Sequence, residues 1–228
     1  MNREITYKRS RRSKNLYIKI KPFSDVIVSM PFFMLKSTAE DFVDKKSSWI
    51  QKKLLEIKQI EQSHNKSLNG FKTRYSTVTF KGTSASRVSF RILKNEISVF
   101  VPKNLNEKDV QVHKCAIRAI NKSLMMESEL ILPKRVEEIS QKYNLLYNSL
   151  TIKYTKTRWG SCSGKNDIIL NPHLLRLPDE LLDYVILHEL THTKVKNHSK
   201  KFWSTIKSLD ANAKKLDKEL KQYSLQYF

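Results

Sequence analysis

Alternating apolar and polar positions predict β-strands in the first hundred residues. In NLYIKIKP, Leu16, Ile18 and Ile20 alternate with polar or amphipathic neighbours, and DVIVSMP follows shortly after. The same pattern returns between residues 76 and 101, in TVTFKG, RVSFRIL and EISVFVP. A shorter pair, LTIKYTK and DIILN, flanks the loop RWGSCSGKN beyond residue 149. Most predicted strands therefore lie in the N-terminal half.

Apolar residues at helical spacing predict three longer helical regions, over residues 36–62, 107–143 and 178–195. Pro133 is expected to break or kink the second of them. The third begins PDELLDYVILHELTH, with a proline and two acids suited to a first helical turn. The combination predicts an α+β fold. We expect N-terminal antiparallel strands with helices in a basic region, residues 1–105, followed by a helical domain with a small sheet, residues 106–228, the two being either separate or continuous.

Two short segments of the chain resemble each other weakly. VSMP at residues 28–31 and VFVP at residues 99–102 each end a predicted strand before a helix, with an offset of 71 residues. Two instances are too few to predict a repeat, because short apolar strings recur by chance.

The positive net charge of the chain is compatible with a polyanionic partner. The formal net charge is +21, from 43 Lys and Arg against 22 Asp and Glu, and residues 3–21 are its densest basic stretch. The electrostatic field of such a basic protein attracts nucleic acid. A well-solvated basic surface explains the same count, and no nucleic-acid fold signature accompanies it. Both interpretations stay open.

The cysteine pattern and the hydropathy indicate a reducing compartment. Cys115 and Cys162 form neither a disulfide framework nor a CxxC motif. The N-terminus lacks the apolar core of a secretory signal, and no apolar run approaches the length of a membrane span. We therefore expect a cytoplasmic protein without a membrane partner.

The sequence HELTH carries the strongest chemical signal. His188 and His192 stand four residues apart, so on a helix they lie on one face, about one turn apart. Two imidazoles there can bind one metal ion, and Glu189 lies beside them as a candidate general base. Zinc at such a site lowers the pKa of a bound water toward neutrality.

A third ligand is expected because catalytic zinc sites use three protein ligands and keep one position open. His198 is six residues beyond His192, about 9 Å further along a straight helix, so the chain must turn between residues 193 and 197. Asn197 could supply a left-handed helix end, and Ser199 a cap for the next helix. The spacing is that of the metzincin pattern, but Val195 occupies the metzincin glycine position.

These motifs carry a resemblance to a known family. RWGSCS, ILN, LPDELLDYVILHELTH and NHSKKFW resemble the YgjP-like metallopeptidases, which are related to the SprT-like and WLM-type peptidases. The resemblance implies a zincin-like (minigluzincin) core and a zinc peptidase that acts on peptides or proteins. It implies one Zn²⁺ per chain, held by His188, His192 and His198, with Glu189 as the base. The related families act on DNA-bound proteins, so peptidase activity and nucleic-acid association could coexist.

Four further residues are candidates for supporting the site or binding substrate. Arg158 and Trp159 lie in RWGSCS, where the alternative is a structural turn, and Asn171 and His173 precede the third helix. His173 could stabilise an oxyanion, but a surface histidine is the interpretation that we favour. A non-catalytic zinc protein is a further alternative, but structural sites are usually closed by four ligands.

Four other residues concern how the site is supported. Asp183 and Asp210 are both candidates to accept the second ring N–H of a ligand histidine. Phe202 and Trp203 are expected to pack in the core and hold His198 in place.

Overall fold

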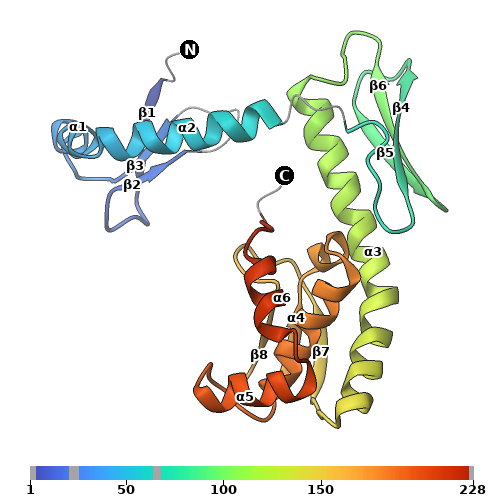
Figure 1. The fold of residues 1–228 in the computed structure, drawn as a ribbon. Helices are drawn as coiled ribbons and strands as arrows, with labels where there is room; N and C mark the ends of the chain where they lie inside the picture. Colours follow the sequence, from blue (N-terminus) through green and yellow to red (C-terminus); the bar gives the residue numbers. More distant parts are fainter. Residues whose placement is uncertain (1–3, 21–25, 64–67, 226–228) are drawn as a thin grey trace. The chain divides into compact units, whose positions relative to one another are not determined.

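The computed structural model describes residues 4–20, 26–63 and 68–225 and divides into two compact units, residues 1–67 and 68–228. Figure 1 shows the first unit in blue and cyan and the second in green to red. The first unit holds strands β1 (Ile5–Ser10), β2 (Tyr17–Lys19) and β3 (Val26–Pro31) and helices α1 (Lys36–Lys45) and α2 (Ser47–Ser63). Alternate residues of β3, namely Val26, Val28 and Met30, are buried against Ala39 and Val43 of α1 and Ile50 of α2.

The second unit contains two sheets and the remaining helices. Its first sheet consists of β4 (Thr77–Thr83), β5 (Ser89–Leu93) and β6 (Glu96–Pro102), and helix α3 (Val110–Tyr143) follows. Its second sheet consists of β7 (Ser149–Ile152), β8 (Gly160–Cys162) and β9 (Asp167–Leu170). A 3-10 turn, η1 (Pro172–Arg176), then leads to α4 (Asp179–Thr191), α5 (Lys200–Leu209) and α6 (Ala213–Leu220).

One topology recurs in all three sheets. In each, the third strand is central, parallel to the first strand and antiparallel to the second, giving the orders β1-β3-β2, β4-β6-β5 and β7-β9-β8. Helical structure follows each central strand. The similar segments VSMP and VFVP therefore lie at the ends of two central strands, β3 and β6. Strand β9 is the central strand of the third sheet.

The α+β class is confirmed. The N-terminal strands are antiparallel only in part, because each sheet combines one antiparallel and one parallel pair. Strand alternation reports which residues face the core and says nothing about strand direction. The compact units divide after residue 67, and not at residue 105. The β4-β6-β5 sheet packs on α3, so a boundary at 105 would cut through one hydrophobic core.

Helix α3 runs unbroken through Pro133, so of the two expected effects, a break or a kink, the break does not occur. Its buried face includes Leu124, Leu132, Val136 and Ile139, and it packs in one core with both flanking sheets and α4. Burial of this face outweighs the one backbone hydrogen bond that a proline removes. Among the described residues, no helix combines the length and apolarity that crossing a bilayer requires.

Candidate metal centre

Helix α4 is the central helix of the second unit. It begins after Pro178, with Asp179 and Glu180 in its first turn, where carboxylates suit the positive helix end. Five apolar residues of the helix are all buried: Leu181, Leu182, Val185, Ile186 and Leu190. Tyr184 and Leu187 are buried as well, so apolar contacts hold the helix on nearly every side.

The imidazoles of His188, His192 and His198 converge at the end of α4. The Nε2 atom of His198 lies 2.9 Å from that of His188 and 3.2 Å from that of His192. One ligand atom from each ring lies within 4.8 Å of the others. His192 is buried, His188 half-buried and His198 exposed, so the cluster is open to solvent on the His198 side.

The chain turns after α4, which allows His198 to reach the other two rings. The helix ends at Thr191, earlier than the predicted residue 195, and further turn bonds join Thr193 to Leu190 and Val195 to Thr191. Asn197 is not in the left-handed conformation that we expected. Its side chain instead accepts a hydrogen bond from the Ser199 amide at 3.3 Å, just ahead of α5. Ser199 occupies the N-cap position as predicted, although its side chain forms no capping bond.

The ring of Phe202 contacts the rings of all three histidines. Phe202 is fully buried, its ring stacks on His192 with 4.6 Å between centroids, and the rings of His188 and His198 each lie 4.9 Å from it. Trp203 packs against the core beside Phe202. Phe202 therefore packs against all three histidines, in agreement with the prediction.

The second ring nitrogens of two histidines have partners that orient the rings. His192 Nδ1 lies 2.9 Å from the carbonyl oxygen of Val195, and His188 Nδ1 lies 3.3 Å from the Tyr184 hydroxyl. Tyr184 in turn donates to Asp217 Oδ1 at 3.3 Å. A hydroxyl that donates to a carboxylate accepts from the imidazole, so Nδ1 of both rings carries the proton and Nε2 is free to bind a metal.

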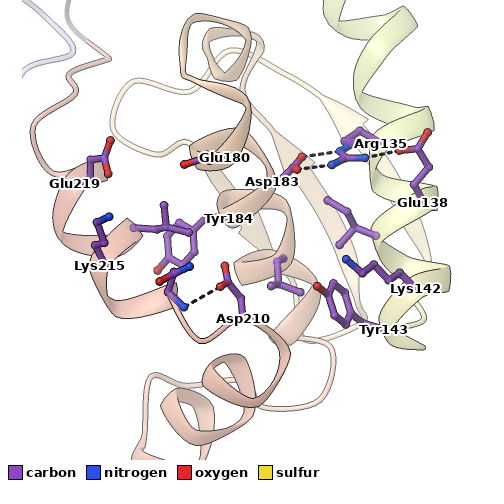
Figure 2. A pocket seen from close by; sticks show the side chains of 14 residues that line it. Arg135, Glu138, Lys142, Tyr143, Glu180, Asp183, Tyr184, Asp210, Lys215 and Glu219 are labelled. Atoms are coloured by element: carbon purple, nitrogen blue, oxygen red, sulfur yellow. Dashed lines mark hydrogen bonds and ion pairs between the residues drawn. The ribbon is translucent and has the colours of Figure 1, made fainter.

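The two aspartates that the sequence offered for this role have other partners. Asp183 is paired with Arg135, and Asp210 accepts from the Asn212 amide at 2.8 Å. Both line a pocket of about 420 Å³ between α3, α4 and α6, shown in Figure 2. Tyr184 belongs to the same lining. Its position four residues before His188 is the helical spacing by which the sequence could have indicated it.

Replacing Tyr184 by phenylalanine removes only the hydroxyl that links His188 to Asp217. We expect the affinity for a divalent metal ion to fall about 10- to 100-fold, the usual range for loss of an outer-shell partner. Competition with a chromophoric chelator measures this change. The matched control is Tyr147→Phe, which removes a hydroxyl bonded to Glu137. Unchanged affinity in Tyr184→Phe would show that the hydroxyl does not support His188.

Glu189 is buried beside the first two histidines, and the backbone of β8 closes over it. A Cβ atom at Gly160 would lie 2.8 Å from Glu189 Cγ and 3.0 Å from Oε1, so any larger residue there would displace the glutamate. Burial raises the pKa of Glu189 to about 7, and the charge of Arg158 opposes that shift. Burial, together with the other two rings, lowers the pKa of His188 to about 4, and burial also lowers the pKa of His192.

Of the four supporting candidates, Arg158 and Trp159 lie just before β8, and Asn171 and His173 lie between β9 and α4. Arg158 is exposed but acts electrostatically on Glu189, whereas Trp159 packs against the core one residue ahead of β8. Asn171 is fully buried, with its side chain bonded to residues 155, 158 and 173. His173 is buried and therefore not a surface histidine. Its ring lies 5.2 Å from that of Tyr154, and burial lowers its pKa to about 4.

The three histidines suit a divalent metal ion that is neither a strongly hard nor a strongly soft Lewis acid. Three imidazole nitrogens converge, and burial lowers the pKa of both His188 and His192, which favours the neutral rings that metal binding requires. Among the described residues this is the one group of histidine, cysteine and acidic side chains close enough to share an ion. Cys162 is not part of this group.

A mixed α+β fold with three converging imidazoles beside a buried glutamate is the arrangement expected of a metallopeptidase domain. A family model described as "YgjP-like, metallopeptidase domain" matches residues 14–223. The chain belongs to this family. No match was found among curated proteins.

Two similar solved structures are metallopeptidase zymogens. Abylysin of Pyrococcus abyssi is 24% identical, with a TM-score of 0.36, over 40% of this chain and 94% of its own. Jannalysin of Methanocaldococcus jannaschii is 29% identical, with a TM-score of 0.35, over 40% of this chain and 93% of its own. Both alignments cover less than half of this chain.

Proposed function

We propose that this protein is a zinc-dependent, zincin-like metallopeptidase whose metal ligands are His188, His192 and His198. The observation that carries the proposal is the convergence of three Nε2 atoms at the end of the helix that also carries the buried Glu189. Membership of a metallopeptidase family supports the reaction class. Three histidine ligands and an exposed side favour an open, catalytic site over a closed structural one.

In this proposal Glu189 is the general base and acid. Zinc held by the three histidines supplies the Lewis acidity that activates water and polarises a peptide carbonyl. The Glu189 carboxylate takes a proton from the attacking water and delivers it to the departing amine nitrogen. A pKa near 7 suits both steps, because the group can gain and lose a proton at neutral pH.

The surroundings of Glu189 keep its carboxylate in place. Gly160 permits the close approach of β8, and the low exposure of Glu189 limits competing water. Arg158 offsets part of the cost of burying a negative charge. The peptide or protein substrate would reach the site from the exposed His198 side. Neither the family nor the site supports the nucleic-acid alternative.

Metal analysis tests the proposal directly. We expect one zinc ion per chain in protein purified without chelators, and peptide hydrolysis that a chelator abolishes and added Zn²⁺ restores. Elemental analysis and cleavage of a mixed peptide library measure the two results. Protein that is metal-free after gentle purification and takes up no zinc on titration would overturn the proposal.

A further inference from the structure

Strand β8 and the loop before it lie next to the proposed base. A Cβ atom on Gly160, the first residue of β8, would lie 2.8 Å from Glu189 Cγ, and the charge of Arg158 acts on Glu189. Because Arg158 is exposed and belongs to a loop, its own packing does not hold it there. Another group must fix this loop.

Asn171 supplies the bonds that fix it. Its side-chain amide nitrogen lies 2.9 Å from the Thr155 carbonyl oxygen, 3.0 Å from Thr155 Oγ1 and 3.1 Å from the Arg158 carbonyl oxygen. Its backbone N–H donates to the Trp159 carbonyl at 2.9 Å. Thr155 Oγ1 also donates to the Arg158 carbonyl, so Thr155 and Asn171 converge on that one oxygen.

The central strands of the other two sheets do not lead into an asparagine. Strands β3 and β6 end at a proline, Pro31 and Pro102. Strand β9 ends at Leu170, and Asn171 follows it. Proline has no N–H and no side-chain amide, so Pro31 and Pro102 can make none of the donor bonds that Asn171 makes.

We propose that Asn171 is a positioning residue, which holds residues 155–159 so that Arg158 and the start of β8 lie against Glu189. The inference rests on the proposed function, because it assigns Asn171 a purpose in orienting the general base. It explains why an asparagine stands in the one sheet that borders the histidine cluster. Asn171 touches neither substrate nor metal in this account and acts through the loop.

A double-mutant cycle with Arg158 tests the proposal. In folded, zinc-loaded protein, Asn171→Ala should lower kcat about 10- to 100-fold, with KM nearly unchanged and one zinc retained per chain. In the Arg158→Gln background, the same substitution should cost less than about threefold, because coupled residues are not additive. Equal losses in the two backgrounds would overturn the proposal, and so would an unchanged kcat.

Amide hydrogen exchange provides a readout that needs neither metal nor activity. In the metal-free protein, Asn171→Ala should speed exchange across residues 155–160 roughly tenfold, since the loop loses its anchor. The matched control is Asn148→Ala, which removes an exposed amide bonded to Asp167 at the opposite end of β9. It should leave both the exchange of this loop and kcat unchanged. Unchanged exchange in Asn171→Ala would overturn the proposal.

A second variant covers the case in which Asn171→Ala does not fold. Thr155→Val removes the hydroxyl shared by Asn171 and the Arg158 carbonyl at a half-buried site, and it should give a smaller loss of kcat that again depends on Arg158. Wild-type protein that binds zinc but cleaves no peptide would count against the proposed function alone. The exchange measurement then decides whether Asn171 holds the loop.

Discussion

Replacing Glu189 by glutamine should reduce kcat on a peptide substrate by about 10³-fold while one zinc ion per chain remains bound. General acid–base catalysis contributes about 10²- to 10⁴-fold, and a carboxamide can neither take the proton from water nor return it to the amine. The substitution preserves the size of the side chain beneath Gly160, so the packing of β8 is retained. Steady-state kinetics and elemental analysis of the same preparation measure the two results.

The control for Glu189→Gln is Glu180→Gln, in the exposed first turn of the same helix. This variant makes the same chemical change away from the histidines and should keep wild-type turnover. A Glu189→Gln protein with near-normal kcat would remove Glu189 as the base. A variant that loses zinc would instead show that the carboxylate supports the metal site.

Replacing His198 by alanine should abolish stable zinc binding and, with it, peptide hydrolysis. The ring provides one of three converging Nε2 atoms and comes from beyond the turn, so its loss leaves only the pair on α4. We expect zinc affinity to fall by more than the 10- to 100-fold that loss of an outer-shell partner causes. His198 is exposed, so the metal-free variant should fold normally, which circular dichroism would show.

His173→Gln provides a matched comparison, because His173 lies outside the cluster and its ring contacts Tyr154. It should retain one zinc per chain even if its stability falls. Equal zinc content in His198→Ala and the wild type would remove His198 from the ligand set. Loss of zinc in His173→Gln would show that the metal site extends beyond the three histidines.

Local patterns predicted the convergence of the three histidines because the main elements of the site are local. Helical geometry alone places His188 and His192 on one face, and the distance to His198 required a turn. The turn is present, but its details differ from the prediction. Val195 and Asn197 stabilise it through a carbonyl and a side-chain oxygen, and not through a left-handed residue. Such details depend on which neighbouring groups need a hydrogen-bond partner.

The supporting contacts were harder to foresee because they join residues far apart in the chain. Asp183 and Asp210 were reasonable partners for a ligand histidine, but Arg135 on α3 pairs with the first of them. Asp217, 29 positions beyond His188, takes the supporting role through Tyr184. Sequence spacing contains no information on which of several carboxylates a fold brings to one imidazole.

The sequence by itself determined the chemical class of the site: two histidines one helical turn apart, a glutamate between them and a third histidine beyond a turn. The tertiary structure alone decided the mixed direction of the three sheets, the partner of His188 and the bonds by which Asn171 holds the loop beside Glu189. The physical reason is the range of the interactions. Helical periodicity arises from backbone geometry over a few residues, whereas strand direction and side-chain partners follow from the packing of the whole unit.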